Sequence, residues 1–253
     1  MKRIIIISIL ILVILAISCS HIEDVTVPNG GVVITLDDHH FINWCQVDSL
    51  LKKYNWKASF CVSLIGSRSD LDIQRMHELY EIGHEISGHG YMHVHSVLYV
   101  ATHGMEKYLE DEIIPMMDYF DAESLNVRSF SYPHGSRNNF TDNELLDYFD
   151  ILRATSNGVR TVEKSKCYFD GSPIVYSLGL DDHFSHYSEE YFIDLLTYAH
   201  EEGKIIIFHG HKPVETVTGK YQVSFQTLDM ICKYAYDNNM NFYTLSDLAG
   251  MIE

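Results

Sequence analysis

From about residue 27 onward, the chain alternates short apolar runs with amphipathic stretches. Eight runs are almost continuously apolar, which is typical of parallel strands that helices cover. They lie at 32–36, 58–64, 84–87, 127–132, 151–154, 174–177, 205–208 and 241–244. No Pro-, Gly- or Ser-rich linker divides them, so residues 28–253 are predicted to form one domain.

Helical periodicity fills several of the intervals between these runs. Apolar residues recur at steps of three and four, which indicates stripes that face a core. The stripes are Met105, Leu109, Ile113, Met116 and Phe120, and then Phe192, Leu195, Leu196 and Ala199. Asp142 and Ser188 are predicted to cap helices, and Glu202-Gly203 to end one. Strands that alternate with helices over this length predict a (β/α) barrel.

The amino terminus has a different pattern. Lys2 and Arg3 precede an apolar run at 4–17, which is short for a membrane span of about 20 residues and is typical of an export signal. The segment that ends in Ser18-Cys19 resembles a bacterial lipoprotein cleavage box, which implies that Cys19 carries a lipid. We therefore predict a signal peptide at 1–19, a short tether at 20–27 and an envelope protein that is anchored to a membrane. Plain secretion and an uncleaved anchor are the alternatives.

Charge and cysteine content narrow the possible partners. The net charge is −17, and residues 1–19 contribute two of the cations, so nucleic acid is excluded as a partner and a neutral or amino-sugar glycan is favoured over anionic polymers. Four cysteines follow Cys19, without the close spacing of a zinc or redox motif. Among them, Cys61 lies in an apolar run and is predicted to be a buried free thiol.

Polar residues follow the apolar runs with unusual consistency, and in a barrel those positions share the catalytic face. Asp37 and Asp38 end the first run. His89 and His93 follow the third run, and their spacing of one helical turn would place both imidazoles on one face. Two histidines and a carboxylate can hold a metal ion and leave positions open for water and substrate.

Four motifs occur along the chain in an order that is more specific than any one motif. Thr35-Leu36-Asp37-Asp38 is followed by Gly83-His84-Glu85-Ile86 with the His89 and His93 pair, by Ser131-Tyr132-Pro133-His134-Gly135, and by the run 205–210, which ends in Phe208-His209-Gly210. This order resembles the NodB-type polysaccharide deacetylases of carbohydrate esterase family 4 over nearly the whole mature chain. The resemblance implies a distorted (β/α) barrel of about seven parallel strands that removes acetyl groups from glycans, with N-acetyl groups favoured over O-acetyl groups as the target.

The resemblance also implies residue roles. Asp38, His89 and His93 would bind a divalent ion, most often Zn²⁺. Asp37 would be the general base, His209 would protonate the leaving group, and the backbone N–H of His134 would stabilise the oxyanion.

The chain departs from the family pattern in several places. His39 and His40 follow the aspartate pair where the family has glycine, and Gly90 replaces a Ser or Thr. Ser131 stands where the family has an arginine that orients the catalytic aspartate, and Arg128 and Arg153 are the candidates to replace it, although strand alternation turns Arg128 away. Asp181 and Asp182 are the candidates to orient His209, with helix capping or solvation as the alternative.

Two other functions remain open from the sequence. One is a non-catalytic glycan-binding lipoprotein, which the missing arginine favours. The other is a small-molecule amide hydrolase of the same fold, which the unusual Tyr132-Pro133 version of the third motif favours.

Overall fold

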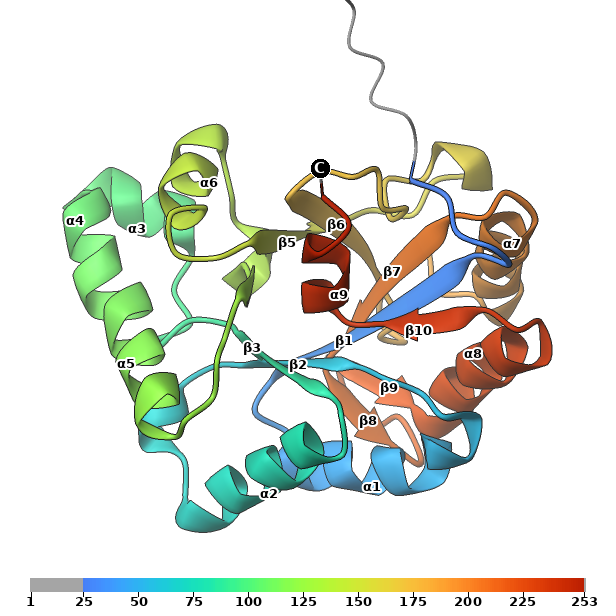
Figure 1. The fold of residues 1–253 in the computed structure, drawn as a ribbon, viewed down its shortest axis with the longest axis horizontal. Coiled ribbons are helices and arrows are strands. Elements are labelled where there is room, and N and C mark those ends of the chain that lie inside the picture. The colour runs from blue at the N-terminus through green and yellow to red at the C-terminus, as the bar shows by residue number, and fades with distance from the viewer. Residues whose placement is uncertain (1–24, 253) are drawn as a thin grey trace, which may run out of the picture.

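The computed structural model describes residues 25–252, and these form a closed parallel barrel inside a ring of helices (Figure 1). The seven barrel strands are β1 (Gly31–Asp38), β2 (Ser59–Val62), β3 (Glu85–Gly88), β4 (Ser129–Ser131), β5 (Ile151–Ser156), β6 (Ile174–Gly179) and β7 (Ile205–Gly210). Each pairs in parallel with the next, and β7 closes onto β1. The predicted barrel of about seven parallel strands is confirmed.

The barrel is irregular at two places. β3 and β4 share a single register pair, Gly88 with Phe130, so that the wall is weakest there. β10 (Asn241–Tyr243) pairs with the first residues of β1, Gly31 to Val33. β2 pairs with the last residues of β1, Thr35 to Asp38, along the same edge. An eighth strand therefore fits beside β1 without widening the closed ring. A separate pair, β8 (Lys212–Val214) and β9 (Gln222–Ser224), follows β7.

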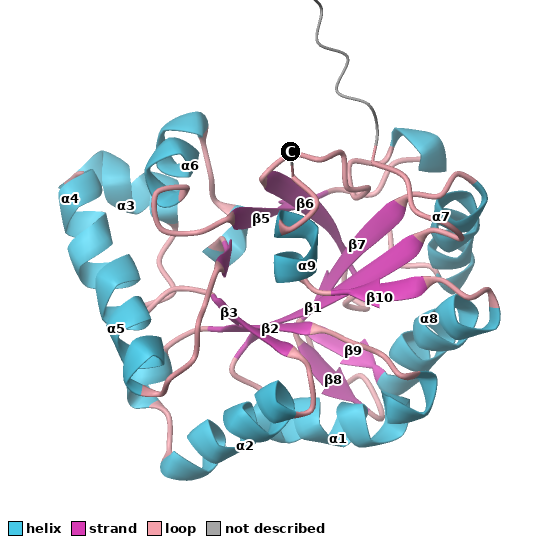
Figure 2. Ribbon diagram, viewed as in Figure 1, coloured by secondary structure: helices cyan, strands magenta, loops and turns pink. Residues whose placement is uncertain are grey.

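The helices cover the outside of the barrel (Figure 2). They are α1 (Phe41–Leu51), α2 (Asp70–Glu81), α3 (Ser96–His103), α4 (Met105–Tyr108), α5 (Ile114–Ala122), α6 (Asn139–Leu145), α7 (Glu189–Glu201) and α8 (Phe225–Asp237). A π-helical turn, η3 (Leu109–Ile113), joins α4 to α5. Within the described residues, no helix has both the length and the apolar character needed to cross a membrane.

Helix boundaries follow the predicted signals with one exception. Ser188 caps α7, whose last residue is Glu201. The prediction that Asp142 caps a helix is wrong, because Asn138 caps α6 in a capping box with Thr141. Asp142 lies inside that helix and accepts hydrogen bonds from Tyr132 and Arg137.

The short helix α9 (Leu245–Ala249) closes the amino-terminal end of the barrel, and Figure 1 shows it in front of the barrel centre. Its Leu245 and Leu248 pack with inward apolar residues such as Val33 and Ile205. Val25 and Val27, which fall within the predicted tether, also pack against this cluster. With one end filled by apolar side chains, the carboxyl ends of the strands are left for polar chemistry.

Candidate active site

Strand alternation places one set of polar side chains inside the carboxyl end of the barrel. Along each strand every second residue points inward, so the apolar layer formed by residues such as Val33 and Ile205 is followed by a polar layer. That layer borders a cavity of about 430 Å³. Its walls include the expected site residues Asp37, Asp38, His89, His93, His134 and His209, together with Arg153 and His211.

Asp38, His89 and His93 converge at one side of this cavity. His93 Nε2 lies 3.2 Å from His89 Nε2 and 3.3 Å from Asp38 Oδ1, and His89 Nε2 lies 3.8 Å from the same oxygen. Ligands at about 2.0 to 2.2 Å from a tetrahedral ion are separated by ~3.3 to 3.6 Å. The spacing of these three atoms therefore fits one face of such a site.

The protonation states of the histidines also suit a cation. Burial lowers the pKa of His89 to about 3 and that of His93 to about 4, so both rings are neutral at neutral pH. His89 Nδ1 lies 2.8 Å from the carbonyl oxygen of Ser131, to which it donates, and this leaves the Nε2 lone pair directed at the site. The donor set is therefore suited to a divalent ion such as Zn²⁺.

The histidine pair reaches this arrangement by a route that the sequence did not indicate. The expected helical turn is absent, because His89 follows β3 directly and His93 lies in a loop before α3. Gly90 has φ +85° and His93 has φ +60°, and these left-handed residues fold the loop back. Asp38 also has φ +82°, which breaks the alternation of β1 and lets two consecutive aspartates reach the same cavity.

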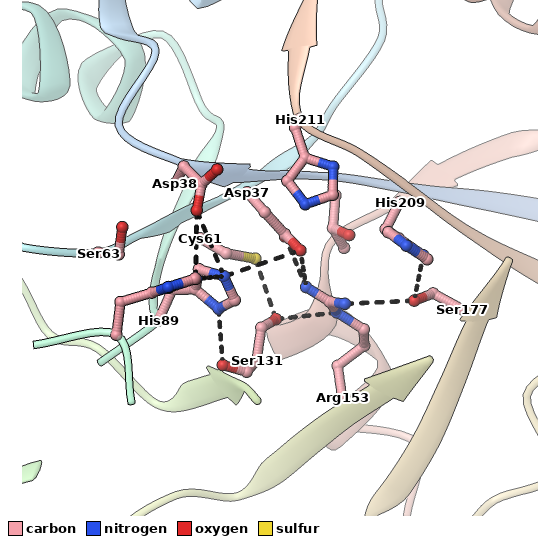
Figure 3. Close-up of polar contacts among 12 residues, drawn as sticks. Asp37, Asp38, Cys61, Ser63, His89, Ser131, Arg153, Ser177, His209 and His211 are labelled. Carbon is pink, nitrogen blue, oxygen red and sulfur yellow. Dashed lines mark hydrogen bonds and ion pairs between the residues drawn. The ribbon is translucent and has the colours of Figure 1, made fainter. Parts of the chain in front are cut away.

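Asp37 is held by a guanidinium that comes from β5. Arg153 Nη2 donates to both carboxylate oxygens of Asp37, at 2.5 and 2.6 Å, and both side chains are buried (Figure 3). Burial alone would raise the pKa of Asp37, but the charge of Arg153 holds it well below its usual range. The carboxylate is therefore ionised at any physiological pH, and it lies 4.0 Å from His89 Nε2.

Ser131 and Arg153 together replace the expected arginine. They are register partners on β4 and β5, so both point inward, and Arg153 Nε donates to Ser131 Oγ at 3.0 Å. The guanidinium has thus moved to the neighbouring strand. Arg128, which we proposed as a supporting residue, does not reach the site, because it is exposed and pairs with Asp150 at 2.6 Å.

The two histidines at the end of β7 have different partners. His209 is buried, and its Nδ1 lies 2.9 Å from Ser177 Oγ. Burial, followed by the charge of Arg153, lowers the pKa of His209 well below its usual value. The Nδ1 atom of His211 lies 2.6 Å from Oδ2 of the buried Asp181. The other carboxylate oxygen of Asp181 accepts a hydrogen bond from the His211 backbone N–H. Burial lowers the pKa of His211, but Asp181 overcomes this effect and the net shift is upward.

This pairing corrects the expectation for the acidic pair. Asp181 orients His211 and not His209, and the side chain of Asp182 is exposed beside the barrel. The sequence contained a sign that His211 could reach the site. It lies two residues after His209, and in an extended chain residues two apart point to the same side. What the sequence could not show was which of the two imidazoles meets the carboxylate.

The remaining expected residues lie at the rim. The ring of His134 is exposed and packs against those of His93 and His95, with ring centroids 4.7 and 6.0 Å apart. His134 has φ +59°, and none of the hydrogen bonds found for residues 25–252 uses its backbone N–H. His40 Nε2 lies 3.8 Å from Asp38 Oδ2, and His39 faces Ser63 Oγ at 3.3 Å.

Comparison with known families agrees with this geometry. The family model described as polysaccharide deacetylase matches residues 24–148, which contain the first three motifs. No curated protein gives a significant match to the sequence.

Several solved structures share the fold. A peptidoglycan deacetylase from Bacillus subtilis is 17% identical, with a TM-score of 0.56 over 88% of this chain and 91% of that one. A carbohydrate esterase family 4 enzyme from Streptococcus mutans is 14% identical, with a TM-score of 0.57 over 85% and 86%. A family 4 acetyl xylan esterase from Clostridium thermocellum, solved with a cobalt ion, is 17% identical, with a TM-score of 0.52 over 87% and 90%. At these identities the likeness shows the fold.

Proposed function

We propose that this chain is a polysaccharide deacetylase of the NodB type in carbohydrate esterase family 4, a metal-dependent hydrolase that removes acetyl groups from a glycan. We further propose that its target is an N-acetyl and not an O-acetyl group, at a bacterial cell envelope. The observation that carries the proposal is the cavity in which the Asp38, His89 and His93 cluster lies beside the Asp37–Arg153 pair.

Asp38, His89 and His93 are the ligands for the divalent ion, most often zinc in such sites. When bound, the ion supplies Lewis acidity that polarises the acetyl carbonyl and lowers the pKa of water. Because both imidazoles are neutral and Asp38 supplies one negative charge, these three residues would leave a bound divalent ion with a net positive charge, which would favour developing negative charge on the acetyl oxygen.

Asp37 acts as the general base that takes the proton from the attacking water. Its pKa lies well below the usual range because Arg153 stabilises the carboxylate, so Asp37 is ionised at neutral pH and its oxygens can accept a hydrogen bond from the attacking water. Arg153 also fixes where the two oxygens lie, which positions the base relative to the ligand His89.

We assign proton donation to the leaving group to His211 in place of His209. A donor has to hold a proton at the working pH, and the pKa of His209 is shifted well below its usual value, whereas that of His211 is raised. Asp181 takes Nδ1–H of His211, so that Nε2 is the nitrogen that can donate into the cavity. His209 then serves as a neutral residue in the wall of the cavity.

The backbone N–H of His134 is the second group for the oxyanion. It belongs to the turn Pro133–Gly135, and the residue lines the cavity. A preorganised donor of this kind contributes about 3 to 4 kcal/mol of transition-state stabilisation.

The cavity suits an uncharged sugar. Rings of His134, Phe184, His186 and Tyr221 surround it, and such rings offer faces to the apolar side of a pyranose. The acidic chain repels anionic polymers, which favours a neutral or amino-sugar substrate.

The test is acetate release from defined oligosaccharides by purified protein. We expect release from N-acetylglucosamine oligomers to exceed that from O-acetylated xylo-oligomers, and to be abolished by a chelator or by Asp37→Asn. Binding of the oligomers without acetate release from either would contradict the proposal and support a glycan-binding protein. One reason for that alternative was the missing arginine, and the contact of Arg153 with Asp37 weighs against it.

A further inference from the structure

The buried residue Glu112 accepts three backbone hydrogen bonds from the loop that carries the metal ligand His93. The loop at 89–94 contains two left-handed residues, Gly90 and His93, and so lacks the hydrogen bonds of regular structure. Three of its backbone N–H groups donate to Glu112. Tyr91 N–H bonds to the carbonyl oxygen at 3.1 Å, Met92 N–H to Oε2 at 2.6 Å and Val94 N–H to Oε1 at 2.9 Å.

The π-helical turn explains why a glutamate points into this loop. Glu112 lies in η3 (Leu109–Ile113), between the α-helical segments α4 and α5. A π turn adds a residue to one turn and disturbs the regular pairing of carbonyl groups, which allows a carbonyl to accept from outside the helix. Glu112 accepts in this way from Tyr91, and its side chain has no exposed surface.

Gly90 and Glu112 fit each other. A Cβ atom at residue 90 would stand 2.1 Å from Glu112 Oε1, so any side chain there would collide with the carboxylate. The resemblance to the family led us to expect a Ser or Thr at this position. In this chain the carboxylate of Glu112 fills that space, and the loop is held from the helix side.

Building on the proposed metal site, we propose that Glu112 is a positioning residue that sets the affinity for the divalent ion by fixing the loop of His93. The two carboxylate bonds lie on the residues directly before and after His93, Met92 and Val94. The loop conformation is unfavourable on its own, because His93, which is not a glycine, has left-handed backbone angles. Without either bond to Glu112, the loop would therefore leave this conformation. The imidazole of His93 would then leave its place 3.3 Å from Asp38.

The decisive variant is Glu112→Gln, because glutamine keeps the size of the side chain but replaces one acceptor with an NH₂ that faces an N–H donor. Glu85→Gln is the matched control. Glu85 is also buried and accepts from the Ser246 backbone N–H and from Ser59, but it lies in the wall near α9 and does not contact the metal site. Zinc affinity is measured by competition with a chromophoric chelator, and thermal unfolding is measured with and without zinc.

We expect Glu112→Gln to weaken zinc binding about 10- to 100-fold, as loss of a residue that orients a ligand does. Excess zinc should restore most of the acetate release. The control should lower the melting temperature of the zinc-free protein but leave zinc affinity within about twofold of the wild type. Wild-type affinity in Glu112→Gln would overturn this inference alone, and so would an equal loss in both variants. Wild-type protein that binds no zinc would overturn the proposed function as well.

Gly90→Ala provides an independent test if Glu112→Gln does not fold. The added methyl group would push the Glu112 carboxylate away from the loop without changing the chemistry of Glu112, and a side chain at φ +85° would also strain the loop backbone. We expect weaker zinc binding here too, and wild-type affinity in a folded Gly90→Ala protein would overturn the inference.

Discussion

Arg153 on β5 donates from one nitrogen to both carboxylate oxygens of Asp37 on β1, at 2.5 and 2.6 Å, inside the barrel. Two opposite charges are buried together, so each depends on the other to offset its desolvation. The pair links the β4–β5 side of the barrel, through Ser131, to the strand that carries both aspartates. A structural and a catalytic prediction follow from the same contact.

Arg153→Met should destabilise the metal-free protein by about 3 to 5 kcal/mol at neutral pH, because it leaves a buried carboxylate unpaired. Asp37 has a lower pKa in the folded protein than in the unfolded chain, where it is about 3.9. The ionised carboxylate therefore stabilises the folded protein above about pH 3.9, and this stabilisation is lost as the pH falls toward the pKa of the folded state. The gap between the two proteins should therefore narrow in acid. Urea unfolding across pH measures this, with the exposed Arg128→Met as a control that should change stability by less than about 1 kcal/mol. Equal effects at Arg128 and Arg153 would contradict the prediction.

Zinc should stabilise the wild-type protein and not a variant that lacks a ligand. At 100 times the dissociation constant, a ligand that binds only the folded state adds about 2.7 kcal/mol. We expect zinc to raise the melting temperature of the wild type, and His93→Ala to abolish the rise. The exposed His103→Ala is the control, and it should respond as the wild type does. A rise that survives in His93→Ala would place the ion elsewhere.

The pH profile of acetate release should identify the proton donor. Asp181 raises the pKa of His211, so Asp181→Asn should lower it, and the alkaline limb of the profile should move to lower pH. Asp182→Asn, at an exposed neighbour, should leave the profile unchanged. If Ser177→Ala moves the limb and Asp181→Asn does not, His209 is the donor, because Ser177 is the partner of His209.

Thiol reactivity should follow burial. The four cysteines between residues 25 and 252 are free, as predicted for Cys61, and only Cys45 has an accessible side chain. Burial raises the pKa of Cys61 to about 12 and that of Cys167 to about 12, so neither forms a thiolate at neutral pH. Partial burial also raises the pKa of Cys45, so we expect an aromatic disulfide reagent to label its thiol slowly, but faster than the three buried thiols, and the labelling to disappear in Cys45→Ser. Rapid labelling of Cys61, Cys167 or Cys232 in the native state would show that the barrel opens.

The amino-terminal predictions at Cys19 lie outside the described residues and stay predictions. If Cys19 is lipidated, radiolabelled palmitate should enter the wild-type protein during growth and should not enter Cys19→Ala. The variant should also leave the membrane fraction. Equal labelling of both proteins would exclude lipidation at Cys19.

Local pattern was enough to predict the barrel. Continuous apolar runs such as 205–208 and the helical stripe at 192–199 depend on neighbours in the chain, and the structure contains β7 and α7 at those places. The polar residues that end those runs, among them Asp37, His89 and His209, were expected at one end of the barrel because parallel strands place their carboxyl ends together. The metal-ligand set also followed from motif order, and the structure brings its three residues within reach of one ion.

Pairings across the barrel could not be predicted in this way, because they depend on register between strands and on backbone angles at single residues. The sequence left Arg128 and Arg153 as alternatives, and the register of β4 with β5 decided for Arg153. The sequence predicted an acidic residue beside His209, but in the structure Asp181 is hydrogen-bonded to His211. Asp38 reaches the same cavity as Asp37 only because of its left-handed backbone, and Glu112 reaches the His93 loop only through a π-helical turn. Hydrophobic periodicity specifies which face of an element is buried, and such contacts are specified only when the elements pack against one another.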